Sequence, residues 1–316
     1  MSLALLFSPQ GSQAIGMGRE LADTAPAARA TFAEADATLG WSISDVCWNG
    51  PEAALNDTRQ TQPCLLTASI AALRALEGRG SVVPAYVAGH SVGEYAALVA
   101  AGVLPFDAAL RLVARRASLM ADVDTGGGMA AVIGLDRATV DEVVGAVGRP
   151  TELVVANDNA PGQVVISGTA DGLAAVEEPM KAAGARRVIR LPVSGAFHSP
   201  LMAGVADALH EAFETESWAD ARVPVVSNVT GEPITDAGRI RALLAEQVRS
   251  PVEWVRSVQR MRDDGVDTMF ELGSGGALVG MVKRIAPEVR AHAVHDGATL
   301  DVAAELLGSP AEVAAR

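Results

Sequence analysis

The segment 89–93 carries the strongest chemical signal in the chain, because it places a serine between two glycines in the order GHSVG. An apolar strand is expected just before it, over 85–88, and a helix just after it, over 91–101. That order is the strand-turn-helix setting of a nucleophile elbow. Glycines on both sides of the serine remove Cβ atoms that would clash in so sharp a turn. The alternative interpretation is a tight turn in which Ser91 only caps the helix.

A serine nucleophile needs a general base, and the chain has five histidines. His90 adjoins the serine, but neighbouring side chains diverge at a sharp turn. His210 falls within a polar helical stretch, and His292 and His295 lie near a C-terminal strand. His198 follows an expected strand, and loops after strands in α/β proteins point toward the active edge of the sheet. The sequence therefore favours His198 as the base, with an ordinary loop histidine as the alternative.

The composition of the 316-residue chain excludes several classes of protein. With 49% hydrophobic residues it can bury a large core, so we expect a globular protein. The net charge of −13 repels phosphate groups, which makes nucleic acids and anionic membranes poor partners. Cys47 and Cys64 form no Cys-x-x-Cys pair, which excludes a thiolate zinc site and fits a reducing cytoplasm. No signal peptide or membrane span is expected.

The spacing of apolar residues predicts alternating strands and helices, and hence a mainly parallel sheet covered by helices on both faces. The expected strands of this sheet are 3–7, 85–88, 223–227 and 268–272. The expected helices are 17–39, 61–77 (opened by Thr61 and Pro63), 91–101, one opened by Pro105, 200–214, 237–247 and 254–263.

A different rhythm follows three consecutive glycines at 126–128, which we interpret as a flexible break. Strands are expected over 129–133, 153–156, 163–167 and 187–191, with helices over 137–147 and 172–183. This βαββαβ order is that of a ferredoxin-like subdomain. The predicted division is a small inserted subdomain over 125–195, and a larger catalytic domain made of 1–124 and 196–316.

The extended serine motif GHSVGEY, over 89–95, resembles that of the malonyl-CoA:acyl carrier protein transacylases, or acyl-carrier-protein S-malonyltransferases. Other segments agree with this family in order and spacing, and together they cover nearly the whole chain. They are QGSQ at 10–13, TQP at 61–63, RLV at 111–113, GQVVISG at 162–168, FHSPLM at 197–202, and Gln247 with Pro251, Val252 and Trp254.

The resemblance assigns catalytic functions to five residues. Ser91 is similar to the acyl-accepting nucleophile and His198 to its base. The family's histidine is oriented by a backbone carbonyl, and Gln247 matches that position, so no acid side chain is needed as a third member. The backbone N–H groups of Gln10 and Val92 match the oxyanion hole.

Other matched residues are expected to bind the substrate. Arg116 matches the arginine that binds the malonyl carboxylate, and Gln62 lies in a matched segment. A guanidinium offers two parallel donors to a carboxylate, and acetyl lacks that group. The residues alone do not distinguish Arg116 from Arg115. Phe197 resembles the aromatic residue that leaves little room for an α-methyl group, with core packing as the alternative.

One departure from the family concerns the glutamine loop. The family usually has Phe-Pro-Gly before the glutamine, whereas this chain has Phe7, Ser8 and Pro9. Proline has no N–H and restricts its own φ, and it disfavours the α region for Ser8. The N–H of Gln10 survives, but the sequence leaves its direction open.

The resemblance implies an α/β-hydrolase-like large domain with an inserted ferredoxin-like subdomain. It implies a ping-pong enzyme that moves malonyl from malonyl-CoA to the phosphopantetheine thiol of acyl carrier protein, in fatty-acid or polyketide synthesis. No metal or bound cofactor is needed, and a cytoplasmic monomer is expected. The alternatives are a serine esterase or thioesterase, a malonyl transferase serving malonate decarboxylase, and a binding protein that kept the fold.

Acyl carrier proteins are acidic, as this chain is, so docking must use a local basic patch rather than net charge. The candidates are Lys181, Arg186, Arg187 and Arg190 on the small subdomain, with Lys283 and Arg284 on the large domain. The alternative is that these are ordinary solvated charges.

Overall fold

The computed structural model describes residues 1–123, 125–149, 151–193 and 195–308, and it contains two β-sheets. The larger sheet has the strand order β10-β9-β1-β2-β7-β8. Neighbouring strands run parallel except β7 and β8. The prediction of a mainly parallel sheet is therefore confirmed. Its strands are β1 (Leu3–Phe7), β2 (Tyr86–Gly89), β7 (Val225–Val226), β8 (Pro233–Ile234), β9 (Thr268–Leu272) and β10 (Arg290–Val294).

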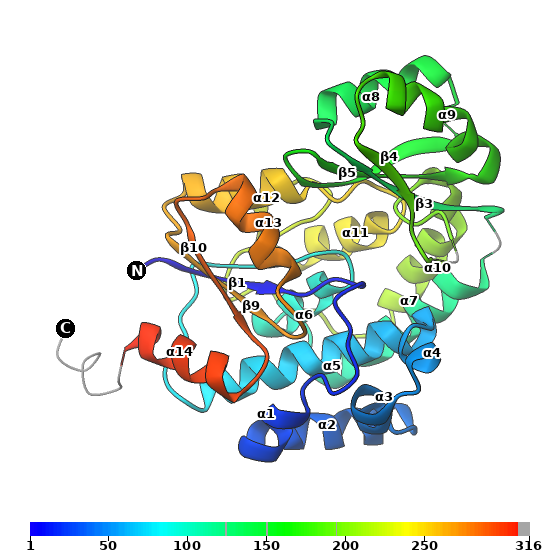
Figure 1. Cartoon of the computed structure of the whole chain (residues 1–316). Helices are drawn as coiled ribbons and strands as arrows, with labels where there is room; N and C mark the ends of the chain where they lie inside the picture. The colour runs from blue at the N-terminus through cyan, green and yellow to red at the C-terminus, as the bar shows by residue number, and fades with distance from the viewer. Residues whose placement is uncertain (124, 150, 194, 309–316) are drawn as a thin grey trace.

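Helices cover both faces of this sheet, as Figure 1 shows. They are α1 (Arg19–Thr24), α2 (Pro26–Leu39), α3 (Ile43–Asn49), α4 (Glu52–Leu55), α5 (Thr58–Glu77), α6 (Gly93–Ala100), α7 (Phe106–Asp122), the 3₁₀ turn η1 (Pro200–Met202), α10 (Ala203–Phe213), α11 (Ala237–Gln247), α12 (Trp254–Asp263), α13 (Ala277–Ile285) and α14 (Gly297–Leu307). No helix in the described ranges is both long and apolar enough to cross a membrane.

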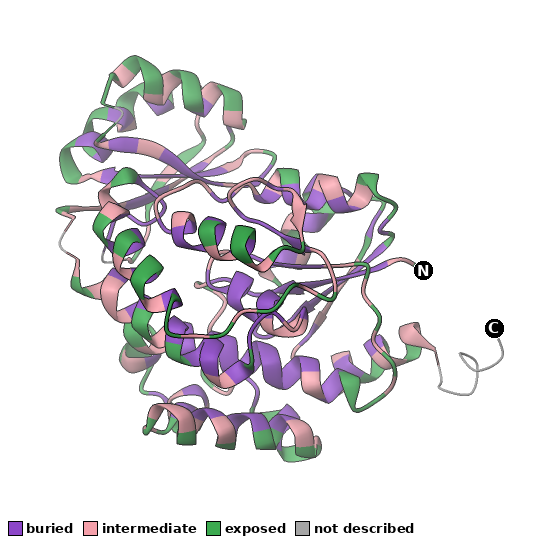
Figure 2. Ribbon diagram, turned by 180° about the vertical axis from the view of Figure 1, so that it is seen from behind, coloured by how far each residue is buried: buried purple, intermediate pink, exposed green. Residues whose placement is uncertain are grey.

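Side chains of β1 alternate between two hydrophobic clusters, because successive residues of a strand point to opposite faces. Leu5 and Phe7 pack in the cluster that contains the buried residues of α2, α5 and α7. Ala4 and Leu6 pack in the cluster that contains those of α12 and α13. The buried face of α5 runs along nearly its whole length (Figure 2), so β1 and α5 form the centre of the larger domain.

The smaller sheet has the order β4-β5-β3-β6 and is antiparallel throughout. It lies at the top right of Figure 1 with two helices on one face. The chain order, βαββαβ, is the predicted one. Its elements are β3 (Gly127–Ile133), α8 (Arg137–Val147), β4 (Leu153–Ala160), β5 (Gln163–Thr169), α9 (Ala170–Ala182) and β6 (Arg187–Arg190). The domain boundaries at 125 and 195 stay a prediction.

Strand β4 joins the two parts of the molecule. The N–H of Val252 donates to the carbonyl of Ala156 at 2.8 Å, and the N–H of Asp158 donates to the carbonyl of Val252 at 3.0 Å. A parallel bridge also pairs Asn157 with Val252. The backbone of the small subdomain is therefore hydrogen-bonded to the loop that follows α11.

The prediction of one helix over 17–39 is wrong. The structure has α1 and α2, separated by Ala25, whose φ of −117° and ψ of 113° are extended. Pro26 causes the break, because proline disfavours helical backbone in the residue before it and suits the first position of a new helix.

Two further predictions are wrong. Helix α5 begins at Thr58 rather than at Thr61, because the Asp57 carboxylate accepts from the N–H of Arg59 and caps the helix earlier. The glycines at 126–128 are no flexible break, since Gly127 and Gly128 belong to β3. A Cβ on Gly127 would collide with the backbone of Gly168 on β5, so glycine there permits close strand approach.

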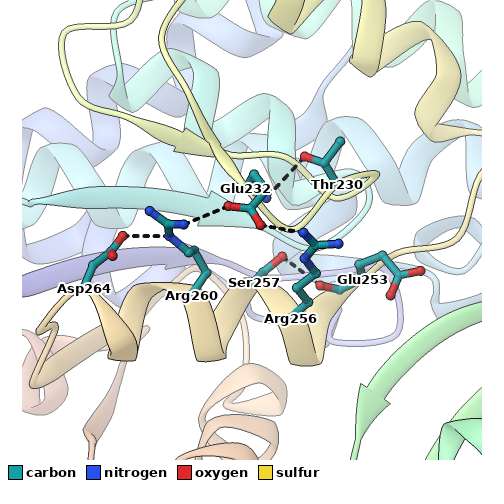
Figure 3. Close-up of polar contacts among 7 residues, drawn as sticks. All are labelled: Thr230, Glu232, Glu253, Arg256, Ser257, Arg260 and Asp264. Atoms are coloured by element: carbon teal, nitrogen blue, oxygen red, sulfur yellow. Dashed lines mark hydrogen bonds and ion pairs between the residues drawn. The ribbon is translucent and has the colours of Figure 1, made fainter.

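A surface network of ion pairs holds the turn between β7 and β8 against α12 (Figure 3). The Glu232 carboxylate bridges Arg256 at 2.6 Å and Arg260 at 3.1 Å, and Arg260 also contacts Asp264 at 2.9 Å. Within the turn, the Thr230 hydroxyl accepts from the Glu232 N–H at 3.2 Å. The same turn carries Asn228, which contacts the serine elbow.

Candidate active site

Ser91 stands in the turn between β2 and α6 with a φ of 54°, in the left-handed region that few residues other than glycine adopt. A Cβ on Gly89 would collide with the backbone of Gly93, and a Cβ on Gly93 would collide with the carbonyl of Phe7. Both positions of the motif therefore need glycine. The turn is pressed against the end of β1, which fixes the direction of the serine side chain.

His198 lies beside the serine. Its Nε2 is 2.8 Å from Ser91 Oγ, and its Nδ1 is 2.8 Å from the backbone carbonyl of Gln247 and 3.3 Å from that of Ser250. A carbonyl only accepts, so Nδ1 carries the proton and Nε2 accepts from the serine hydroxyl. Burial, with the positive charge of Arg116, lowers the pKa of His198 to about 3. The imidazole is therefore neutral near pH 7, as a general base must be.

Arg116 is buried on α7 and reaches the same serine. Its Nη2 donates to Ser91 Oγ at 3.0 Å and to Gln247 Oε1 at 3.1 Å, and its Nη1 donates to Gln62 Oε1 at 2.6 Å. Burial lowers the pKa of this guanidinium. Its neighbour Arg115 is exposed, so the structure separates two arginines that the residues alone did not distinguish.

Two backbone donors lie at the ends of loops around the serine. Val92 is the N-cap residue of α6, and Gln10 lies in the loop after β1. Neither N–H has a hydrogen-bond partner among the residues that the structure describes. The N–H of His90 donates to the carbonyl of Phe7 at 3.2 Å, which ties the end of β1 to the elbow.

Three polar groups of the site were missed by sequence reasoning. The side chain of Gln247 donates through Nε2 to Ser91 O at 2.9 Å and to Glu94 Oε2 at 2.6 Å. Asn228 accepts from the N–H of Ser91 at 2.6 Å and donates to the carbonyl of Gly89 at 2.6 Å. Burial raises the pKa of Glu94 to about 7. The one available signal was Glu94 itself, a carboxylate in an otherwise apolar helical segment.

The other candidate residues fall outside this cluster. His90 is buried, with Nε2 2.8 Å from Asn159 Oδ1, and burial lowers its pKa to about 4. His210 is exposed on α10. Phe197 is 4% exposed and packs in the large hydrophobic cluster, which is the core-packing alternative. A contact of Phe197 with substrate stays a prediction. Among the described residues, no group of three His, Cys, Asp or Glu side chains could hold a metal ion.

The chain is similar to characterised acyltransferases along most of its length. The sequence profile of the acyl transferase domain family matches residues 4–301. The malonyl CoA-acyl carrier protein transacylase of Bacillus subtilis is 43% identical, over 96% of this chain and 97% of that protein. The transacylase of Escherichia coli K12 is 40% identical, over 96% of this chain and 99% of that protein.

Solved structures agree. An acyl carrier protein S-malonyltransferase from Vibrio cholerae superimposes with a TM-score of 0.93 at 39% identity, covering 96% of this chain and 99% of that one. A malonyl-transacylase solved in complex with its type II polyketide synthase acyl-carrier protein gives a TM-score of 0.94 at 40% identity, covering 97% and 100%. These likenesses confirm the predicted α/β fold class. They also show that the chain belongs to the malonyl-CoA:acyl carrier protein transacylase family of acyltransferases.

Proposed function

We propose that the protein transfers malonyl from malonyl-CoA to the phosphopantetheine thiol of acyl carrier protein through a malonyl ester on Ser91. The observation that carries the proposal is a series of hydrogen bonds that runs from the Ser91 hydroxyl through His198 to the Gln247 carbonyl. Arg116 donates to the same hydroxyl. The family membership supports transfer in fatty-acid or polyketide synthesis.

In the first half-reaction, Nε2 of His198 takes the hydroxyl proton as Oγ of Ser91 attacks the thioester carbonyl. The developing oxyanion accepts hydrogen bonds from the backbone N–H groups of Gln10 and Val92. The tetrahedral intermediate collapses, the C–S bond breaks, and the imidazolium returns its proton to the sulfur of coenzyme A. The second half-reaction runs the same steps with the carrier thiol as nucleophile, so one base serves both.

The place of Arg116 fits the length of the malonyl group. The free carboxylate of malonyl is one methylene from the reacting carbonyl, so its binding group has to lie next to the nucleophile. Nη2 of Arg116 is 3.0 Å from Ser91 Oγ, and no described carboxylate forms a salt bridge with it. An acetyl group would leave this buried guanidinium without a carboxylate partner, which disfavours acetyl-CoA. In the proposed steps His198 moves the proton and the N–H groups of Gln10 and Val92 stabilise the oxyanion, so the proposal includes no metal or bound cofactor.

Intact-mass measurement with malonyl-CoA, with and without holo acyl carrier protein, tests the proposal. We expect one malonyl group on Ser91, and its transfer to the carrier when the carrier is added. If water removes the label without carrier as fast as the label is lost when carrier is present, the protein is a thioesterase. A label on another residue, or no label, would overturn the serine assignment.

Two of the six candidate cations for carrier docking have local partners in the structure. Lys181 forms ion pairs with Glu177 and Glu178, so its charge is locally balanced. Arg284 hydrogen-bonds Gln163 and the carbonyl of Pro161. The four remaining candidates are exposed and form no ion pair with a described residue: Arg186, Arg187, Arg190 and Lys283.

We propose that these four cations bind the acidic carrier. Reversing Arg187 and Arg190 to glutamate should raise the KM for the carrier and leave self-acylation by malonyl-CoA intact. Added salt should weaken the carrier step more than the coenzyme A step, because it shortens the Debye length to about 8 Å at physiological ionic strength. Unchanged carrier kinetics after reversal of all four would place docking elsewhere. A cytoplasmic monomer stays part of the proposal, and sedimentation velocity tests the monomer.

A further inference from the structure

The loop between β1 and α1 contains a hydroxyl aimed at a single peptide group. The carbonyl of Pro9 accepts from the Ser12 hydroxyl at 2.6 Å and from the Ser12 N–H at 3.3 Å. The same peptide unit carries the N–H of Gln10. The Gln10 side chain is held separately, since its Nε2 donates to the Thr58 hydroxyl at 3.3 Å.

A peptide unit is planar, and in the trans form its C=O and N–H point in opposite directions. The Pro9–Gln10 peptide is trans. Two hydrogen bonds that turn the Pro9 carbonyl toward Ser12 therefore turn the Gln10 N–H the opposite way. Proline fixes φ at position 9, so the remaining freedom of this peptide plane is mainly the ψ of Pro9, which the Ser12 contacts restrict.

Ser12 is itself held by the neighbouring strand's loop, because β9 pairs with β1 in parallel and both loops leave the same edge of the sheet. The hydroxyl of Ser274, in the loop after β9, donates to the carbonyl of Ser12 at 2.7 Å. One residue before Pro9, the buried Ser8 hydroxyl donates to Glu271 Oε1 at 3.0 Å. The other carboxylate oxygen of Glu271 accepts from the N–H of Val279 at 2.9 Å. Both sides of the Pro9–Gln10 peptide are thus anchored to β9 and the start of α13.

We infer that Ser12 is a positioning residue, which aims the Gln10 N–H at the oxyanion through its hydrogen bonds to the Pro9 carbonyl. The inference rests on the proposed function, in which Gln10 supplies one oxyanion donor. Pro9 alone does not determine the direction of the Gln10 N–H. The Ser12 hydroxyl sets that direction by holding the Pro9 carbonyl.

The test compares Ser12→Ala with Ser12→Thr, which keeps the hydroxyl, in the full chain. Thr215→Ala is the matched control, because the Thr215 hydroxyl also bonds the carbonyl three residues earlier, at 2.7 Å, on the surface after α10. Two rates are measured: self-acylation by malonyl-CoA, and phosphonylation of Ser91 by an alkyl fluorophosphonate. In the second reaction the Oγ–P bond forms, fluoride leaves, and a P–O group occupies the oxyanion site without any carboxylate.

We expect Ser12→Ala to slow both reactions by a similar factor, about tenfold, since complete removal of an oxyanion donor costs roughly 10²–10³-fold. The KM for malonyl-CoA should stay within about twofold, because the contact acts on the transition state. Ser12→Thr should restore most of the rate, and Thr215→Ala should have the native rate. If Ser12→Ala has a lowered melting temperature, the same two rates are compared in Ser12→Thr and in Ser274→Ala, which removes the hydroxyl that holds the Ser12 carbonyl.

Native rates in Ser12→Ala would overturn the inference, as would a loss confined to malonyl-CoA. Slowing in Ser12→Thr equal to that in Ser12→Ala would also overturn it. In each of these cases Ser91→Ala should still be unlabelled, and the proposed function would stand. If Ser91→Ala is labelled at the native rate, the proposed function itself fails.

Discussion

Two polar networks built from the same kinds of groups lie in very different surroundings. The buried one surrounds Ser91 and consists of Arg116, Gln62, Gln247 and Glu94, each at most 2% exposed. The surface one joins the turn between β7 and β8 to α12 and consists of Glu232, Arg256, Arg260 and Asp264, whose side chains are 26–59% exposed. The surface network contains more ion pairs, but none of its four members, each of which the structure describes, hydrogen-bonds to Ser91.

The difference teaches that the number of ionic contacts is a poor measure of their importance. Water replaces a lost partner at the surface, where an ion pair contributes about 0–1 kcal/mol. Inside the protein a lost partner leaves a polar group unsatisfied, so each member of the buried network depends on the others. We therefore expect substitutions in the two networks to differ in both size and kind of effect.

The largest effect is expected from Ser91→Ala, which removes the hydroxyl on which the buried network converges. Acylation by malonyl-CoA should be abolished, as measured by intact mass and peptide mapping. The variant should stay folded, because one hydroxyl is lost at a partly exposed position. A malonyl label on Cys47, on Cys64 or on any residue of this variant would contradict the assignment.

His198→Ala should slow both acylation and transfer to the carrier by roughly 10²–10⁴-fold, the usual contribution of a general base. Rapid-quench measurement of each half-reaction checks this. His210→Ala is the control, since His210 is exposed on α10. Equal slowing by both substitutions, or loss of only one half-reaction, would mean that His198 is not the shared base.

Arg116→Ala should lose malonyl transfer while keeping or gaining activity on acetyl-CoA. Loss of a charge-assisted contact costs roughly 1.5–3 kcal/mol, and more if the malonyl carboxylate stays buried without a partner. The adjacent Arg115→Ala should leave both activities unchanged, because that side chain is exposed. The ratio of kcat/KM for the two thioesters is the measurement, and an equal loss on both would make Arg116 purely structural.

Glu94 should make stability depend on pH. Burial raises its folded pKa from the ordinary 4.5 to about 7, so the folded state holds the proton more tightly than the unfolded chain. The resulting stabilisation is complete below about pH 4.5 and is lost as pH rises through about 7. The loss is on the order of 3 kcal/mol, at about 1.36 kcal/mol per pKa unit. The free energy of unfolding of the native protein, compared with that of Glu94→Gln, should fall across this range. A constant difference would show that Glu94 does not titrate there.

The smallest effect is expected from Glu232→Gln, which breaks the surface ion pairs with Arg256 and Arg260. Unfolding should become easier by less than about 1 kcal/mol, and high salt should abolish the difference from the native protein. The acylation rate should not change. A loss of activity would mean that the surface network positions Asn228 at the serine, and the contrast between the two networks would not hold.

Regular elements with an uninterrupted apolar period were predicted well. Helices α8, α11 and α12 and strand β9 have the predicted bounds. Two errors occur where one residue overrides the period, as Pro26 does by breaking a helix and Asp57 does by starting one early. Other bounds were also inexact: the strand predicted over 223–227 is only Val225–Val226, and the strand predicted over 153–156 continues to Ala160. The glycines at 126–128 misled for the opposite reason, because close packing between β3 and β5 requires glycine where the sequence suggested flexibility.

The reacting residues could be predicted from the sequence, whereas most of their supports could not. Ser91 is identified by its motif. Its place after a strand favours His198, but that strand, β6, belongs to the small antiparallel sheet, so the family resemblance is what identifies this histidine. The partners of the Gln247 side chain lie 131 to 156 residues away, so only the folded chain shows which buried polar groups meet. The choice of Arg116 over Arg115 likewise depends on which face of α7 is buried, and the resemblance anticipated it where local sequence did not.

The backbone of Ser91 and that of His198, with φ of 54° and 58°, have a consequence for how this protein tolerates change. Left-handed backbone costs a residue with a Cβ roughly 1–2 kcal/mol, and glycine escapes most of that cost. Glycine at either position would relieve this backbone cost. The same change would remove buried hydrogen-bond partners, since Ser91 accepts from Arg116 and the ring of His198 contacts the Gln247 carbonyl. The stability of Ser91→Gly and of His198→Gly therefore measures the difference between relieved backbone strain and lost contacts.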